Sequence, residues 1–162
     1  MRPDGTFPRL AHCHLMIDRV VFFIALLSAA TALGGALAHA LELPNKIGMP
    51  RDDYFVVQRI YRGWSRLGFL LAVEVISILA LIILFWPDPV ICWAAICAML
   101  SLLAAQFVFW TYAFPADAAT GNWTRIPPNW KLLRRQWEFS HAAGAGLQLL
   151  AVSALIVAAL SA

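Results

Sequence analysis

The sequence predicts an all-α integral membrane protein, an antiparallel bundle of four transmembrane helices with short helical extensions on one side. Of its 162 residues, 62% are hydrophobic and 13% are charged, which is about half the charged share of a soluble domain. Four stretches are almost free of charge, and each is long enough for a helix to cross the hydrocarbon layer. They are residues 20–41, 67–86, 90–114 and 139–162, and only Glu74 places an acid inside one of them.

The first transmembrane helix is expected at about 16–43, and it opens a single four-helix domain of residues 16–162. Residues 1–15 precede it as a mobile lead. The segment does not have the pattern of a cleaved signal peptide, because its apolar run is too long and no small-residue cleavage site follows it. Pro44 comes directly after the predicted helix.

Proline and capping residues mark the beginnings of the other helices. Asp52 or Asp53, after Pro50, is expected to cap the second helix, and Asn129 is expected to cap the fourth. Residues 87–89 (Pro-Asp-Pro) form a tight hairpin between the second and third helices. We therefore expect the remaining helices at about 52–86, 90–114 and 130–160.

Basic residues are concentrated in the two long connections, roughly 42–66 and 115–138, which lie on the same side of the bundle. They hold nine of the twelve basic residues: Lys46, Arg51, Arg59, Arg62, Arg66, Arg125, Lys131, Arg134 and Arg135. The positive-inside rule predicts a multi-pass inner-membrane protein with these loops in the cytoplasm and both termini outside. Anionic lipid headgroups account for the net charge of +3, and no interleaved aromatic and basic groove predicts a nucleic-acid partner.

Two mirrored motifs are the strongest functional signal. His39-x-x-Glu42 closes the first apolar stretch, and Glu138-x-x-His141 opens the last. In antiparallel helices these motifs lie at the same depth, with each histidine about 4.5 Å further into the membrane than its glutamate. Ionisable side chains are costly in a bilayer, so four matched ones predict a functional site.

Other polar residues extend this site deeper into the membrane. Glu74 and Gln106 are expected at similar depths, about one turn below the histidines, and Gln148 lies deeper still. Arg134, Glu138, His141 and Gln148 form a polar stripe on the fourth helix, which should face the bundle interior because lipid cannot satisfy it. Tryptophans gather at the same end; most suit the membrane interface, while Trp110 and Trp130 are candidates for the wall of a pocket.

Three kinds of chemistry, and one structural alternative, are compatible with these residues. A dinuclear iron or manganese site would use His39, Glu42, Glu74, Glu138 and His141, although helix bundles of that type supply one more carboxylate. A b-type haem would take His39 and His141 as axial ligands. With no cofactor, a buried histidine would act as a general base. In the structural alternative, Arg134 or Arg135 neutralises Glu138 and each histidine is hydrogen-bonded.

At these residues the chain resembles a known family. The resemblance covers about residues 16–160 and rests on these motifs: His39 through Lys46, Tyr54 with Gln58, Tyr61-Arg62-Gly63-Trp64, Asn122-Trp123-Thr124, and Asn129-Trp130 through Arg134 to Trp137-Glu138 and His141. They resemble the anthrone oxygenase-like family of small four-helix membrane proteins, whose bacterial members are mostly of unknown function. The resemblance implies oxygen insertion at an activated methylene of an aromatic polyketide without a conventional cofactor. It marks as site positions His39, Glu42, Tyr61, Arg62, Trp130, Glu138 and His141.

Together these observations predict an oxidoreductase or oxygenase that acts on a hydrophobic aromatic or quinone-like molecule entering from the lipid. His39 or His141 abstracts a proton, Glu42 and Glu138 orient the imidazoles, and Arg62 or Arg134 stabilises the oxyanion. The expected pocket is lined by Tyr61, Gln106, Trp110, Trp130 and Gln148. The alternative is a non-catalytic, haem-binding subunit of a larger membrane complex, and either protein can associate with a membrane-protein partner or with a second copy of the chain.

Overall fold

The computed structural model describes the backbone of residues 7–162 and the side chains of residues 16–162. This part of the chain is all-α, which confirms the predicted fold class. Four of its helical segments are long and apolar enough to cross a membrane: Met16–Lys46, Trp64–Leu84, Pro89–Thr120 and Trp130–Leu160. The protein is therefore a multi-pass membrane protein.

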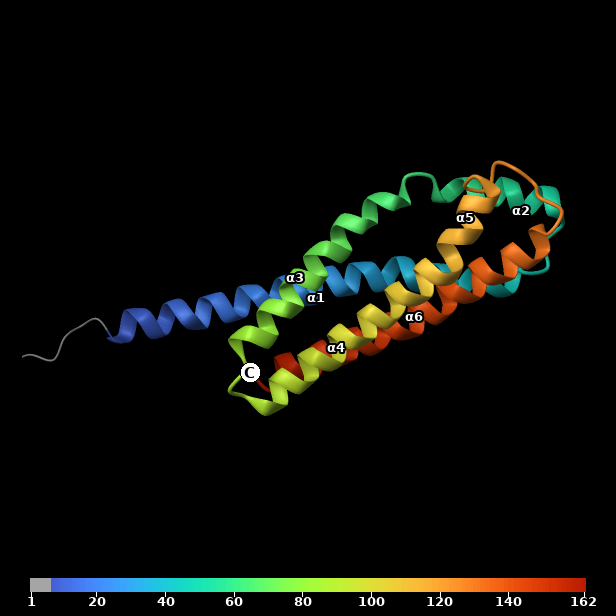
Figure 1. The fold of residues 1–162 in the computed structure, drawn as a ribbon. Coiled ribbons are helices and arrows are strands. Elements are labelled where there is room, and N and C mark those ends of the chain that lie inside the picture. Colours follow the sequence, from blue (N-terminus) through green and yellow to red (C-terminus); the bar gives the residue numbers. More distant parts are fainter. Residues whose placement is uncertain (1–6) are drawn as a thin grey trace, which may run out of the picture.

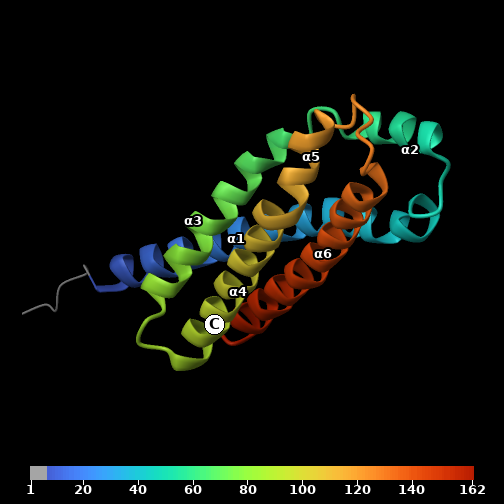
Figure 2. The ribbon, with the colours of Figure 1, turned by 45° about the vertical axis from the view of Figure 1, so that its right-hand side comes forward.

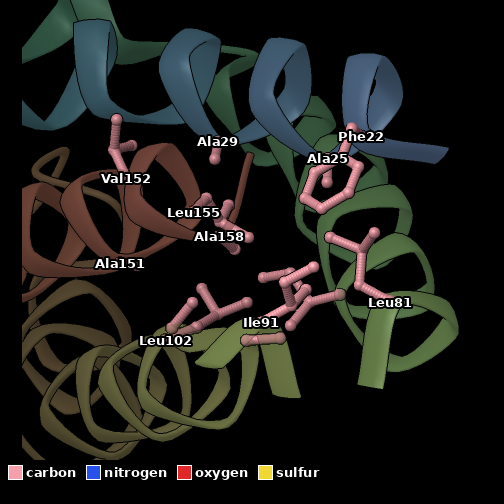
Figure 3. Close-up of a cluster of buried hydrophobic side chains, with 13 residues drawn as sticks. Phe22, Ala25, Ala29, Leu81, Ile91, Leu102, Ala151, Val152, Leu155 and Ala158 are labelled. Carbon is pink, nitrogen blue, oxygen red and sulfur yellow. The ribbon is translucent and has the colours of Figure 1, made fainter. Parts of the chain in front are cut away.

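The four long helices form an antiparallel ring (Figure 1). Helix α1 (Phe7–Lys46) packs between α3 (Gly68–Leu84) and α6 (Trp130–Leu160), and α4 (Pro89–Val108) packs against the same two helices from the other side. The apolar core between them is drawn in Figure 3 and joins Phe22, Ala29, Leu81, Leu102 and Leu155, among others. Small alanines on α1, α4 and α6 allow these helices to approach closely.

The short elements gather at one end of the bundle, opposite the α3–α4 hairpin (Figure 2). They are α2 (Arg51–Val57), the two 3-10 turns Gln58–Tyr61 and Trp64–Leu67, the π-helical turn Phe109–Ala113, and α5 (Phe114–Thr120). A second buried cluster holds this end together, formed by Tyr54, Phe55, Ala113, Ala116, Trp123, Leu133 and Trp137. The predicted helical extensions on the side of the long loops are therefore present.

Two helices extend past their predicted ends, and in both a proline did not end the helix. Helix α1 continues through Pro44 to Lys46, since a proline this close to the end of a helix removes only one intrahelical hydrogen bond. The third transmembrane segment continues from α4 through the π-helical turn into α5, and so passes the expected end at residue 114. The turn lies just before Pro115, where the missing N–H interrupts the regular ladder.

The second predicted helix is interrupted. Residues 52–86 were expected to form one helix, but Gly63 adopts a left-handed conformation (φ 88°) and separates the two 3-10 turns. Glycine accepts this conformation at little steric cost. In the 87–89 hairpin the Asp88 side chain caps α4, and its carboxylate accepts hydrogen bonds from the backbone N–H groups of Val90 (3.0 Å) and Ile91 (3.1 Å).

The predicted caps of α2 and α6 form no side-chain capping bond, although the predicted N-cap position of α6 is correct. Pro50 occupies the N-cap position of α2, and the expected caps Asp52 and Asp53 lie inside its first turn. There their charges still favour the helix, because the N-terminus of a helix carries a partial positive charge. Asn129 is the N-cap residue of α6 but makes no side-chain capping bond.

Candidate functional site

The two mirrored motifs meet between α1 and α6. The ring centroids of His39 and His141 are 4.6 Å apart. The equal depth predicted from the antiparallel spacing is therefore confirmed for the two histidines. Their glutamates lie nearer the long-loop end, within the same group of contacting side chains.

Aromatic rings enclose His39. Its ring centroid lies 4.3 Å from that of Tyr61 and 5.1 Å from those of both Trp64 and Trp137. The residue is only 6% exposed, and its Nδ1 has no hydrogen-bond partner among residues 16–162. A buried nitrogen without a partner is uncommon in folded proteins, and it points to a role other than packing.

His141 is held by the backbone of its own helix. Its Nδ1 lies 2.8 Å from the carbonyl oxygen of Trp137. A carbonyl oxygen can only accept, so Nδ1 carries a proton, and in the neutral imidazole this leaves a free lone pair on Nε2. The ring also packs on Trp137 (4.1 Å) and approaches Phe109 of the π-helical turn (6.3 Å). His141 thus has the tautomer and the fixed orientation of a general base.

A buried lysine joins the two motifs. Lys46 is 2% exposed, and its Nζ lies 3.2 Å from Glu42 Oε2 and 3.3 Å from Glu138 Oε2. It also donates a hydrogen bond of 2.7 Å to the Tyr61 hydroxyl. Lys46 therefore links the two motifs through one hydrogen bond and two ion pairs.

Two tyrosine hydroxyls complete the network around the glutamates. Tyr61 donates to Glu42, and Tyr54 donates to Glu138 Oε1 over 3.0 Å. Burial raises the pKa of both hydroxyls, and the neighbouring carboxylates raise these pKa values further. Both tyrosines therefore remain protonated donors. Gln58 Nε2 adds a longer contact of 3.4 Å to the same oxygen of Glu138.

The structure assigns different partners to several predicted site residues. Neither Glu42 nor Glu138 orients an imidazole, because both are bound by Lys46 and the tyrosines. Arg62 is exposed, since the break at Gly63 directs this part of the chain outward. The predicted oxyanion role of Arg62 is therefore not supported.

Arg134 also has another task. Its guanidinium donates to the carbonyl oxygen of Met49 over 2.8 Å and stacks 4.8 Å from the centroid of a Trp130 ring and 5.3 Å from that of Tyr54. It fastens α6 to the loop after α1. In the structural alternative, Arg134 or Arg135 was predicted to neutralise Glu138. This part of the alternative is wrong, because Lys46 forms the ion pair with Glu138.

The deeper polar residues form a separate pair. Gln148 Nε2 donates to Glu74 Oε1 over 2.5 Å and approaches the carbonyl oxygen of Ala29 at 3.4 Å. Gln106 is half-buried on α4 and does not join this pair. Trp110 is 59% exposed, so it faces lipid and does not line the site as expected.

The predicted cofactor sites do not fit this arrangement. Across the described residues, no three His, Cys, Asp or Glu side chains are close enough to hold a metal ion. Glu74, one of the predicted ligands, is instead hydrogen-bonded to Gln148. Two imidazoles that share an axial iron have ring centroids roughly 6 Å apart, given metal–nitrogen bonds of about 2 Å. The observed 4.6 Å between His39 and His141 is too short for a haem between them.

Five residues of the site were not among the predicted site residues: Lys46, Tyr54, Gln58, Trp64 and Trp137. For Lys46 the signal was present, because His39, Glu42 and Lys46 follow one another at i, i+3 and i+7 and so share a helix face. Ending the helix at Pro44 hid this pattern. The positions of Tyr54 and Gln58 depend on how α2 folds back over α6, which sequence spacing does not reveal.

Comparisons with known proteins add no relative. No family model, no curated protein and no solved structure matches this chain.

Proposed function

We propose that this protein is a membrane-embedded, oxygenase-like oxidoreductase that acts on a hydrophobic aromatic or quinone-like molecule. The observation that carries the proposal is the state of His141. Its Nδ1–H is fixed on the Trp137 carbonyl, so Nε2 is available as a base beside an enclosed His39 and a buried Lys46. A structural network would have no need for a free imidazole lone pair within an aromatic enclosure.

The proposed chemistry begins with the loss of a proton from an activated methylene of the substrate to His141 Nε2. The carbanion is stabilised as an enolate, whose oxygen is the natural partner of the Lys46 ammonium group. Addition of O2 and of a proton gives a hydroperoxide, which loses water to leave a carbonyl group. The balance is one methylene and one O2 to one carbonyl and one water, and no reductant is needed. In this proposal Lys46 stabilises the oxyanion, the role that the sequence had assigned to Arg62 or Arg134.

The location of the site supports a lipid-dissolved substrate. His39 and His141 lie within membrane-spanning segments, and aromatic rings surround His39. We further propose that the long loops face the cytoplasm of an inner-membrane protein. The positive-inside rule supports this orientation, because seven basic residues at that end are exposed: Arg51, Arg59, Arg62, Arg66, Arg125, Lys131 and Arg135.

Turnover of an anthrone by the purified protein in lipid nanodiscs tests the proposal. Oxygen uptake and the absorbance of the quinone product report the rate. His141→Asn retains an N–H that can reach the Trp137 carbonyl but provides no base, so we expect a loss of at least about 100-fold, the usual share of a general base. His39→Phe retains the ring packing and tests whether the imidazole itself is needed.

Gln106→Ala is the matched control, because Gln106 lies on another helix and outside the network; it should retain normal turnover. Full turnover in both histidine variants would remove the basis of the proposal. A purified protein that lacks turnover but holds a stable larger partner would favour the alternative, a non-catalytic subunit.

A further inference from the structure

The segment that covers His39 has an unusual construction. Residues 59–67, here called the lid, connect α2 to α3 and contain Tyr61 and Trp64. Both rings pack on the His39 ring, with centroids 4.3 and 5.1 Å away. The lid therefore forms one wall of the enclosure around His39.

The lid is loosely tied to the rest of the protein. Every residue from 62 to 69 is exposed, and the lid consists of two short 3-10 turns on either side of a left-handed Gly63. Its backbone hydrogen bonds Arg62 N–H to Arg59 O (3.3 Å) and Arg66 N–H to Gly63 O (3.1 Å) both stay within the lid. Segments with exposed backbone and few buried contacts open at low free energy.

One side chain, Tyr61, latches the lid through two hydrogen bonds. The Tyr61 hydroxyl accepts from Lys46 and donates to Glu42. On the near side of the lid, Gln58 is buried and contacts Glu138, so the chain is anchored before the lid begins. A movement of the lid would thus release Tyr61 while α2 stays in place.

Lys46 provides a chemical reason for such a movement. Its ammonium group donates a hydrogen bond to Tyr61 and forms ion pairs with Glu42 and Glu138. A ligand oxygen that accepts this hydrogen bond takes the place of the Tyr61 hydroxyl. Tyr61 is the replaceable partner, because its hydroxyl is neutral and it belongs to the loosely tied lid.

The outer surface of the lid suits the membrane boundary. Arg59, Arg62 and Arg66 are exposed, and they alternate with exposed Ile60 and Leu67. The membrane-spanning segment that contains α3 begins at Trp64, so the lid lies where this segment enters the bilayer. Arginines favour the headgroup layer there, while the apolar side chains favour the hydrocarbon.

We propose that residues 59–67 are an interfacial lid, latched by the Tyr61 hydroxyl on Glu42 and Lys46, which opens at the membrane surface to admit a hydrophobic ligand to His39. The lid controls access whatever reaction follows, and so this proposal goes beyond the proposed oxygenase function. Its test measures the accessibility of His39 and not turnover, which keeps the two proposals distinguishable.

The experiment measures the rate at which diethyl pyrocarbonate, a small apolar reagent that acylates imidazole, modifies His39 in nanodiscs. Mass spectrometry of the His39 peptide gives the rate, which is corrected with free N-acetylhistidine. Tyr61→Phe removes both hydrogen bonds of the latch but retains the ring. Modification should become at least about fivefold faster, because the loss of even one hydrogen bond corresponds to about that factor. Tyr54→Phe is the matched control, since it removes a hydroxyl from Glu138 outside the lid and should leave the rate unchanged.

A second pair of variants tests the opposite effect, a lid that is held closed more tightly. A methyl group on Gly35 would lie 3.7 Å from Trp64 Cζ3 and 3.8 Å from Leu67 Cδ1, whereas one on Gly34 would have no neighbour within 4 Å. Both substitutions by alanine favour helix α1 equally. Gly35→Ala should therefore slow the modification of His39 about twofold, the effect of a few added van der Waals contacts, and Gly34→Ala should not.

Two results would contradict the proposal that residues 59–67 act as a lid. One is an equal rate of modification in the wild type and Tyr61→Phe. The other is the same acceleration in Tyr54→Phe as in Tyr61→Phe, which would mean that the whole bundle loosens.

Discussion

Lys46 is the cation at the centre of the buried charge network, and its replacement by methionine tests how much this network stabilises the protein. Methionine has a similar volume but no charge, so Lys46→Met leaves the Glu138 carboxylate, which is fully buried, without its cation. At an effective dielectric constant of 20, charges 3.3 Å apart attract by about 5 kcal/mol. Removing one partner of a buried pair destabilises proteins by about 3–5 kcal/mol, and we expect Lys46→Met to lose this much stability.

The contribution of Glu42 should be smaller. Its side chain is 41% exposed, and ion pairs accessible to solvent contribute about 0–1 kcal/mol. Glu42→Gln should therefore cost less than about 1 kcal/mol. In the double variant Lys46→Met/Glu138→Gln no buried charge is left unpaired, so it should recover to within about 2 kcal/mol of the wild type.

Unfolding by sodium dodecyl sulfate in mixed micelles gives these free energies, with tryptophan fluorescence and far-ultraviolet circular dichroism as probes. The double-mutant cycle should give a coupling between Lys46 and Glu138 of at least about 2 kcal/mol. The reasoning fails if Lys46→Met costs less than about 1 kcal/mol, or if the double variant is no more stable than the single one.

Two further predictions concern polar contacts outside that network, and the same unfolding assay measures both. Arg134→Lys should cost about 1–2 kcal/mol, because lysine cannot both stack on Trp130 and donate to the Met49 carbonyl as the planar guanidinium does; an unchanged stability would show that the stacking is incidental. Glu74→Gln preserves a hydrogen bond to Gln148 and should change stability by less than about 1 kcal/mol, whereas Glu74→Ala leaves a cavity and an unpaired amide and should cost about 2–4 kcal/mol. Equal effects of the two substitutions would contradict the importance of this pair.

Much of the architecture could be predicted from the sequence because it depends on local patterns. Length and hydropathy identified the four spans, and the mirrored spacing brought His39 and His141 together. The polar stripe of the fourth helix also faces inward: Arg134, Glu138 and Gln148 are buried. In each case the bilayer excludes an arrangement in which polar side chains face lipid, since polar groups in a bilayer must find partners inside the protein.

The sequence predictions that were wrong concern segments in which the backbone is irregular. The predicted first helix ends before Pro44, whereas α1 continues to Lys46; the prediction therefore misses the central cation of the site. The left-handed Gly63 separates Arg62 from the site. Trp110 was a pocket candidate because tryptophans gather at the long-loop end, but it lies in the π-helical turn that begins at Phe109 and is 59% exposed.

The tautomer of His141 tests the central claim most directly. Nitrogen-15 NMR of histidine-labelled protein in nanodiscs distinguishes a protonated from an unprotonated ring nitrogen, and His141→Asn identifies the signals of His141. Our account predicts a proton on Nδ1, held by the Trp137 carbonyl, and an unprotonated Nε2. A proton on Nε2 would leave His141 without a lone pair to act as a base and would contradict the account.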